Sequence, residues 1–135
     1  MLCKYPPKEA VWQGGIDECY DNSIRYTDKI IGQIFHLLKD QNASLIYLSD
    51  HGQIKEKDTY KHGDYKEAVQ VPLFIWYSAS VHTKNRGEII SETTPTSVVY
   101  PKVLELMGVK NPKTINNAGK YLKLDLQTID YKNLK

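Results

Sequence analysis

The sequence predicts an α/β protein in which helices flank a layered sheet. Three features of the apolar pattern lead to that class: a long stretch with helical spacing, two short apolar runs of strand length, and a later helix-like stretch. Such alternation of helices and strands is typical of layered α/β domains. At 135 residues the chain is one domain's worth or less, which is enough for a single hydrophobic core.

The first predicted element is a long amphipathic helix. Apolar or semi-apolar residues recur every three or four positions, at Ile16, Tyr20, Ile24, Thr27, Ile31, Ile34 and Leu38. This spacing predicts a helix that begins near Asp17 and ends around Asp40–Asn42. Gly32 inside it costs about 1 kcal/mol relative to alanine, so we expect it to mark close packing. The preceding stretch, Met1–Gly15, is punctuated by Pro and Gly and is expected to be irregular.

Two strands are predicted after this helix. Ser44–Ser49 is short, apolar and bounded by polar residues, which favours a strand buried on both faces. Val71–Tyr77 is rich in β-branched and aromatic residues and is expected to form a second buried strand. Pro72 should lie at the start of that strand, where its missing N–H does least harm.

The later part of the chain predicts a turn, a helix and a short strand. Asn85–Gly87 is typical of a turn, and Thr94–Met107 has helical apolar spacing with Gly108 as its C-terminal stop. Pro101 interrupts this pattern, so the helix is either kinked there or starts near that point. Tyr121–Leu126 is expected to be a short strand.

The composition excludes several classes of protein. The net charge of +2 is too small, and the lysines too scattered, for a polyanionic partner, so no nucleic acid is expected. No stretch is long enough to cross a bilayer, and Met1–Pro7 lacks the basic head and apolar core of a secretory signal. Cys3 and Cys19 could form one disulfide in an oxidising compartment or stay as thiols in a reducing one.

The residues that could bind a metal ion or take part in a reaction lie between the two predicted strands. Asp50, His51 and Gly52 follow the first strand, and ligand sites in open α/β sheets gather at the carboxyl ends of strands. Gly52 permits a sharp turn, so a carboxylate and an imidazole could converge on one zinc ion. His62, followed by Gly63, could supply a third contact if the polar loop between them folds back.

Simpler interpretations of these residues remain open on the same pattern. An adjacent Asp and His can form a helix cap, a turn or a hydrogen-bonded couple without any metal. His62 taken alone fits a surface histidine, and Gly63 fits the end of a turn. His36 on the long helix and His82 in a polar turn are expected to be structural or solvent-facing.

A larger pattern of motifs resembles a known family. The motifs, in order, are YDNSIRYTD (Tyr20–Asp28), LIYLSDHG (Leu45–Gly52), KHG (Lys61–Gly63), VPLFIWYS (Val71–Ser78) and TSVVYPKVLELMGV (Thr96–Val109). Together they resemble the later part of the catalytic domain of the phosphoethanolamine transferases, in the sulfatase branch of the alkaline phosphatase superfamily. The match runs from about Tyr5 to Val109. It implies an alkaline phosphatase-like layered sheet, with residues 1–135 forming the C-terminal portion of such a domain.

The resemblance also implies a site and a reaction. It implies that Asp50 and His51 ligate a catalytic zinc ion, and that His62 contacts the transferred phosphoryl group or a second zinc. In this family a threonine attacks the phosphodiester of phosphatidylethanolamine. The phosphoethanolamine then passes to a lipopolysaccharide acceptor, either lipid A or a core sugar. The family works on the periplasmic face of the bacterial inner membrane, where a Cys3–Cys19 disulfide could form.

The sequence departs from the family pattern in its nucleophile. The family's threonine, a glutamate ligand and a further phosphate-binding histidine lie upstream of the counterpart of Tyr5. Thr27, Thr59 and Thr93–Thr96 are in the wrong contexts to replace that threonine. We therefore expect the isolated chain to be inactive, and to self-associate through an exposed sheet edge.

Two other functions stay open beside this interpretation. The chain could be a non-catalytic sulfatase-like module that binds phosphate, metal or a partner protein. It could also belong to a sulfatase or phosphodiesterase that hydrolyses its substrate instead of transferring a group.

Overall fold

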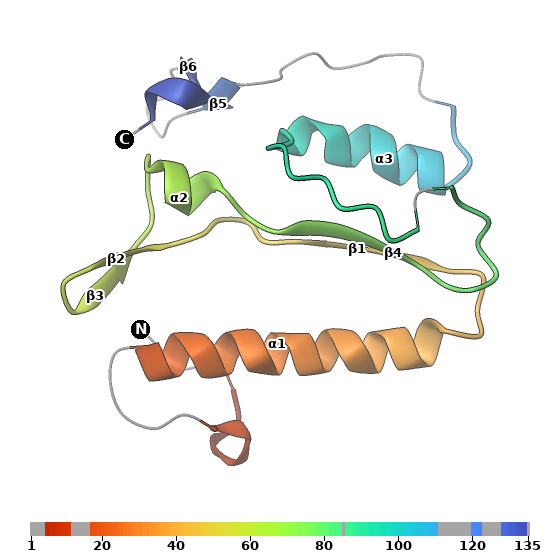
Figure 1. The fold of residues 1–135 in the computed structure, drawn as a ribbon, viewed down its shortest axis with the longest axis horizontal. Coiled ribbons are helices and arrows are strands. Elements are labelled where there is room, and N and C mark those ends of the chain that lie inside the picture. The colour runs from red at the N-terminus through yellow and green to blue at the C-terminus, as the bar shows by residue number, and fades with distance from the viewer. Residues whose placement is uncertain (1–4, 12–16, 85, 111–119, 123–127, 135) are drawn as a thin grey trace. The chain divides into compact units, whose positions relative to one another are not determined.

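A computed structural model describes residues 5–11, 17–84, 86–110, 120–122 and 128–134. The helices are α1 (Asp17–Leu38), α2 (Lys66–Val69) and α3 (Val99–Leu106), with 3-10 turns η1 (Pro7–Glu9), η2 (Thr96–Val98) and η3 (Tyr131–Asn133). The strands are β1 (Ser44–Leu48), β2 (Ile54–Glu56), β3 (Thr59–Lys61), β4 (Leu73–Tyr77), β5 (Lys120–Leu122) and β6 (Thr128–Asp130) (Figure 1). The predicted order of helix, strand, loop, strand and helix is confirmed by α1, β1, β4 and α3.

The chain forms two compact units, each built from several segments. The first unit contains Met1–Tyr47, Lys55–Lys61 and Phe74–Lys84, and therefore α1, the β2–β3 hairpin except Ile54, and most of the β1–β4 pair. The second contains Leu48–Ile54, His62–Leu73 and Asn85–Lys135, and therefore the loop after β1, α2 and α3.

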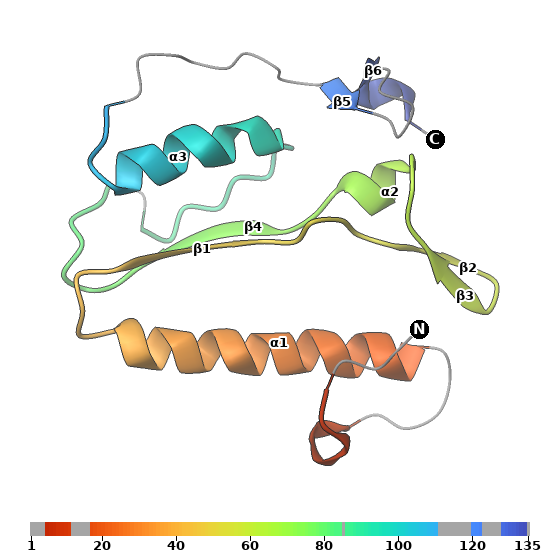
Figure 2. The ribbon, with the colours of Figure 1, turned by 180° about the vertical axis from the view of Figure 1, so that it is seen from behind.

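In the first unit, α1 packs along one face of the β1–β4 pair, as Figures 1 and 2 both show. Aromatic rings make this contact. The ring of Phe35 stacks on Trp76 with centroids 4.9 Å apart and meets Phe74 edge-on at 6.2 Å. Tyr47 on β1 stacks on Phe74 at 5.1 Å, so the aromatic cluster ties the helix to both strands.

The two strands of this pair run in opposite directions. The backbone N–H of Ser78, just after β4, donates to the carbonyl oxygen of Ala43, just before β1, at 3.0 Å. The N–H of Ala43 donates in return to the Ser78 hydroxyl at 3.2 Å. The start of β1 therefore lies beside the end of β4, and the chain leaves β1 near the start of β4.

The predicted burial of Ser44–Ser49 on both faces, and of Val71–Tyr77 as a second buried strand, is wrong. Every residue of β1 is half-buried, and Phe74 in β4 is 36% exposed. Among the described residues β1 pairs with β4 alone, and a two-stranded sheet cannot enclose its own side chains.

The N-terminal part of α1 carries a buried polar anchor. The side chain of Asn22 is fully buried; its Oδ1 accepts from the Val11 N–H at 2.7 Å, and its Nδ2 donates to the Glu18 carbonyl at 2.9 Å. This anchor holds the segment before the helix. Cys19 is disulfide-bonded, and Cys3, the other cysteine of the sequence, lies outside the described residues.

Two expectations about α1 need correction. The helix begins at Asp17 as predicted but ends at Leu38, two residues before the expected range, and residues 39–42 form turns and bends. Gly32 does not mark close packing, because a Cβ placed there would meet nothing within 4 Å.

The β2–β3 hairpin was not predicted, since its segment was expected to be a polar loop. A two-residue turn, Lys57–Asp58, joins the strands, and Lys57 has a positive φ of 53°. The usual signals for such turns are Asn-Gly or Asp-Gly, so this turn gives no clear sign in the sequence.

In the second unit, α3 starts close to Pro101, as one of the two predicted arrangements required. Pro101 is the third residue of α3, where backbone N–H groups have no helical acceptor and a missing N–H costs little. Gly108 ends the helix with a φ of 73°. Its N–H bonds to the Glu105 carbonyl at 2.9 Å while the Val109 N–H bonds to the Leu104 carbonyl at 2.8 Å, so the predicted glycine stop is confirmed.

The last elements form an antiparallel hairpin in which Tyr121 of β5 faces Ile129 of β6. The predicted strand Tyr121–Leu126 coincides with β5 at Tyr121 and Leu122, and its remaining residues lie outside the described part of the chain. Asn85 of the predicted turn also lies outside it, while Gly87 has the positive φ of 77° typical of a turn.

Candidate metal and phosphate site

The loop after β1 is held against α2 at Gly52. The Gly52 N–H donates to the Ala68 carbonyl at 2.6 Å, and Ala68 is only 1% exposed. A Cβ on Gly52 would lie 2.9 Å from the Glu67 carbonyl oxygen, closer than real Cβ atoms approach such an atom. Glycine is therefore required here because the backbone of α2 occupies the space of a side chain.

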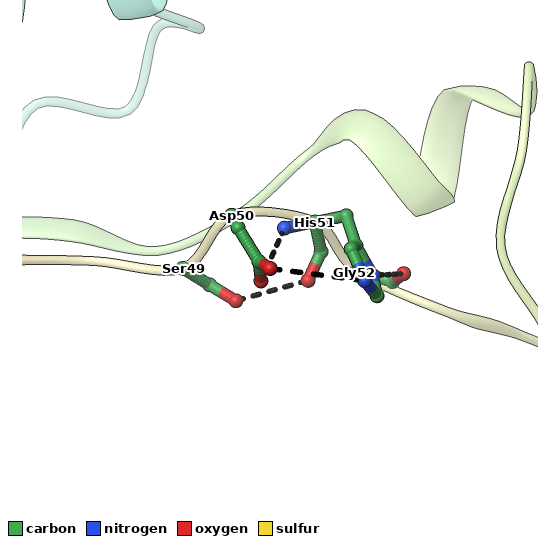
Figure 3. A network of polar contacts seen from close by, with 4 residues as sticks. All are labelled: Ser49, Asp50, His51 and Gly52. Carbon is green, nitrogen blue, oxygen red and sulfur yellow. Dashed lines mark hydrogen bonds and ion pairs between the residues drawn. The ribbon is translucent and has the colours of Figure 1, made fainter.

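Local hydrogen bonds between Ser49 and Gly52 hold the two residues that precede the glycine, as Figure 3 shows. The N–H of His51 donates to Asp50 Oδ1 at 2.9 Å, and the Ser49 hydroxyl donates to the His51 carbonyl at 2.9 Å. The Nδ1 of His51 lies 2.9 Å from the Gly52 carbonyl oxygen. A carbonyl can only accept, so Nδ1 carries the proton, and in the neutral ring Nε2 keeps its lone pair.

Nε2 lies near the second oxygen of the neighbouring carboxylate. His51 Nε2 and Asp50 Oδ2 are 3.9 Å apart, and the side chains are 45% and 88% exposed. With bonds of about 2.0–2.1 Å, two ligands of a tetrahedral zinc ion lie roughly 3.3 Å apart. A small closure would bring both atoms to that spacing. A backbone carbonyl on the other ring nitrogen is also the usual way in which zinc-binding histidines are oriented.

The donor set therefore fits two of the four ligands of a zinc ion. Within the described ranges, no group of three or more His, Cys, Asp or Glu side chains is placed to hold a metal. The remaining ligands would have to come from elsewhere in a complete site.

His62 lies next to this pair. The ring centroids of His51 and His62 are 4.8 Å apart, with the planes tilted by 32°. His62 follows directly after β3, and Gly63 after it has a φ of 149°, a conformation open mainly to glycine. The structure thus brings all three sequence-predicted residues, Asp50, His51 and His62, to one place.

Two further residues of this region were not found by sequence reasoning. Gln53 Oε1 and Asp64 Oδ1 are buried and have no hydrogen-bond partner. Each occupies the third position of a His-Gly-X triplet, which is the only sign of them in the sequence. Buried acceptors without a donor are typical of places where an ion, water or ligand binds.

The other histidines and the threonine on α1 take no part in this arrangement. His36 and His82 were expected to be structural or solvent-facing, and both are exposed. Both lie in the first unit. The Thr27 hydroxyl donates to the Ser23 carbonyl at 2.9 Å along the helix, so it is occupied by the helix backbone.

Comparison with known proteins places this site in a family. The sulfatase family matches residues 3–109, which include every residue of the candidate site. The chain therefore belongs to the sulfatase family, and the predicted alkaline phosphatase-like fold class is confirmed.

Similar proteins narrow the resemblance within this family. The chain is 37% identical to YhbX of Escherichia coli K12 (93% of this chain, 25% of that protein). It is 30% identical to the Kdo(2)-lipid A phosphoethanolamine 7''-transferase of Salmonella typhimurium LT2 (81% and 24%). It is 34% identical to the phosphoethanolamine transferase EptA of Helicobacter pylori 26695 (71% and 20%). The predicted resemblance to phosphoethanolamine transferases is confirmed.

The chain spans about a quarter or less of the length of these relatives. No solved structure matches it significantly. None of the helices in the described residues is both long enough and apolar enough to span a membrane.

Proposed function

We propose that residues 1–135 are the C-terminal portion of the catalytic domain of a zinc-dependent phosphoethanolamine transferase. Its donor would be phosphatidylethanolamine, and its acceptor the lipid A or a core sugar of lipopolysaccharide. The observation that carries the proposal is the convergence of Asp50, His51 and His62 in a chain of the sulfatase family. Two relatives named as phosphoethanolamine transferases support the choice of transferred group.

Each of the three residues has a defined role in this proposal. Asp50 Oδ2 and His51 Nε2 would hold the zinc ion, which would lower the pKa of a nucleophile and neutralise charge on phosphoryl oxygens. The Gly52 carbonyl keeps the His51 ring in the tautomer that exposes Nε2. His62 donates a hydrogen bond to a phosphoryl oxygen and stabilises the charge that develops there in the transition state.

We assign this activity to the periplasmic face of the bacterial inner membrane. One relative is named for its action on Kdo(2)-lipid A, a membrane lipid. The disulfide of Cys19 supports an oxidising compartment, because structural disulfides seldom persist in a reducing cytoplasm.

Zinc binding by the chain and its variants tests the metal part of the proposal. The purified chain is titrated with zinc, and bound metal is measured by elemental analysis after dialysis. Asp50→Ala and His51→Ala should each weaken binding about tenfold or more, since even outer contacts of zinc ligands are worth that much. His82→Ala removes an exposed histidine of the other unit and should leave zinc binding unchanged. Equal zinc content in the chain and in both site variants would refute the assignment.

The role of His62 is tested in the same material by phosphate binding. Nuclear magnetic resonance titration of the zinc-loaded chain with phosphoethanolamine should shift the His62 ring signals and the phosphorus signal of the ligand. His62→Gln should abolish the shift of the phosphorus signal and leave zinc affinity unchanged. If zinc binds and phosphoethanolamine does not, the chain is a metal-binding module and the transferase assignment fails.

A further inference from the structure

The β2–β3 hairpin connects the two halves of the candidate site. β2 starts one residue after Gln53, and β3 ends immediately before His62. Because the two strands pair, the chain returns to its starting point and His62 comes back beside His51. The contact between the two imidazole rings therefore depends on whether this hairpin stays closed.

The hairpin has little internal support of its own. Each strand is three residues long, and an isolated two-stranded hairpin is marginally stable in water. Its turn places Lys57 at a positive φ, which a side chain disfavours. One ion pair, Lys61 with Glu56, joins the strands, but both side chains are about half exposed and such pairs contribute little.

External support comes from the first turn of α1. The carboxylate of Asp17 binds both strands at once. Its Oδ2 lies 2.6 Å from Lys55 Nζ on β2, and its Oδ1 accepts a hydrogen bond from the Tyr60 hydroxyl on β3. The Tyr60 ring also stacks on Tyr20 of α1 with centroids 5.1 Å apart and planes within 16°.

The charge state of these groups suits the contact. The hydrogen bonds from Lys55 and Tyr60 hold the pKa of Asp17 below its usual range, so its carboxylate is charged at neutral pH. A negative charge in the first turn is also favoured by the helix dipole. Tyr60 remains a donor, because its bond to Asp17 raises its pKa to about 12.

We propose that Asp17 is a positioning residue for the candidate site: by tying β2 to β3 through Lys55 and Tyr60, its carboxylate keeps His62 against His51. The catalytic meaning of this contact rests on the function proposed above, whereas the positioning itself can be tested separately. Asp17 touches neither metal nor substrate and acts only through the hairpin.

The test compares Asp17→Asn and Tyr60→Phe with Asp28→Asn. The last variant makes the same chemical change on an exposed residue of the same helix. In the full chain, nuclear Overhauser contacts between the His51 and His62 rings should be present in the wild type and in Asp28→Asn. They should be lost in Asp17→Asn and weakened in Tyr60→Phe, which keeps the ring stacked on Tyr20. Asp17→Glu, which restores the carboxylate, should recover part of them.

A second measurement separates positioning from general loss of structure. Asp17→Asn should weaken phosphoethanolamine binding to the zinc-loaded chain about tenfold, the scale on which supporting contacts of a site usually act. Its zinc affinity should stay near that of the wild type, because Asp50 and His51 precede the hairpin. Equal loss of both affinities would indicate a structural role alone and overturn the proposal.

The two proposals fail in distinguishable ways. If the wild-type chain binds neither zinc nor phosphoethanolamine, the proposed function is wrong, yet the contacts between the histidine rings still report on Asp17. If those contacts persist unchanged in Asp17→Asn, the positioning role is wrong whatever the chain binds.

Discussion

Because Gly52 has no Cβ, the loop after β1 can approach the backbone of α2 closely. The loop bonds to the Ala68 carbonyl, and the carbonyl of Glu67 lies where a side chain would start. Sequence reasoning recognised Gly52 for a sharp turn, whereas the structure shows a close approach between two backbones. Such an approach depends on α2, a four-residue helix with no signal of its own in the sequence.

Gly52→Ala should therefore destabilise the chain. The new Cβ must displace a backbone oxygen, and overpacking of this kind costs about 1–3 kcal/mol. Urea denaturation measures the free energy of unfolding, and the ring signals of His51 should shift in the same variant. Gly32→Ala is the matched control: its Cβ meets nothing within 4 Å, so the helix should gain about 0.5–1 kcal/mol. A neutral Gly52→Ala would show that α2 can move away freely.

Among the elements, α1 could be predicted from the sequence, whereas the β2–β3 hairpin could not. The helix repeats its apolar residues every three or four positions over 22 residues, so its period is unmistakable. The hairpin has two three-residue strands and a Lys-Asp turn, too short for any period. Its partner contacts come from Asp17 and Tyr20, about 40 residues earlier in the chain, and local patterns carry no information about them.

The contact between α1 and the hairpin should weaken at alkaline pH. The pKa of Tyr60 is raised from 10.0 to about 12 in the folded chain, mainly by its hydrogen bond to Asp17. The folded state holds this proton more tightly than the unfolded state. The stability it contributes is therefore complete below pH 10 and is lost as the pH rises toward 12.

Unfolding of the wild type and of Tyr60→Phe at several pH values measures this effect. Using the difference between the two proteins removes the contribution of the other nine tyrosines and of the lysines, which also titrate in this range. The wild type should be the more stable protein below pH 10, and the difference should shrink between pH 10 and 12. A difference that stays constant over that range would contradict the assigned hydrogen bond.

At the scale of the whole molecule, little apolar surface is fully buried. Among the described residues the buried apolar side chains are Ala68 and Leu134, while Asn22 and Ser78 are buried polar ones. The β1–β4 pair has no further strand within the described part of the chain, so each strand keeps one unpaired edge. Unpaired edges with apolar side chains tend to recruit another strand.

We therefore predict that the isolated chain self-associates through β1 or β4. Sedimentation velocity should show a mass that rises with concentration, and amide exchange in these two strands should slow in parallel. Ile89→Ser replaces a residue that is 92% exposed in the other unit and should leave the association intact. A monomer at every concentration, or a monomer produced by Ile89→Ser, would exclude the sheet edge as the cause.

The sequence by itself determined the α/β class and the positions of α1, β1, β4 and α3, and it proposed Asp50, His51 and His62 as site residues. It could do so because periodic apolar spacing, glycine stops and a family's motifs are all written within short stretches. It overestimated the burial of β1 and β4, since burial depends on how many strands and helices cover a sheet.

Only the tertiary structure decided how these residues meet. The tautomer of His51 depends on the Gly52 carbonyl. The contact of His51 with His62 depends on a closed β2–β3 hairpin. The hairpin in turn depends on the carboxylate of Asp17 from α1. The unpaired acceptors of Gln53 and Asp64 likewise appear only once neighbouring groups are in place. The contacts that involve His62 and Asp17 join groups that are not neighbours along the chain, and distances of that kind are set by packing. The bond between His51 and the Gly52 carbonyl joins neighbouring residues, but it depends on backbone angles that the sequence pattern does not specify.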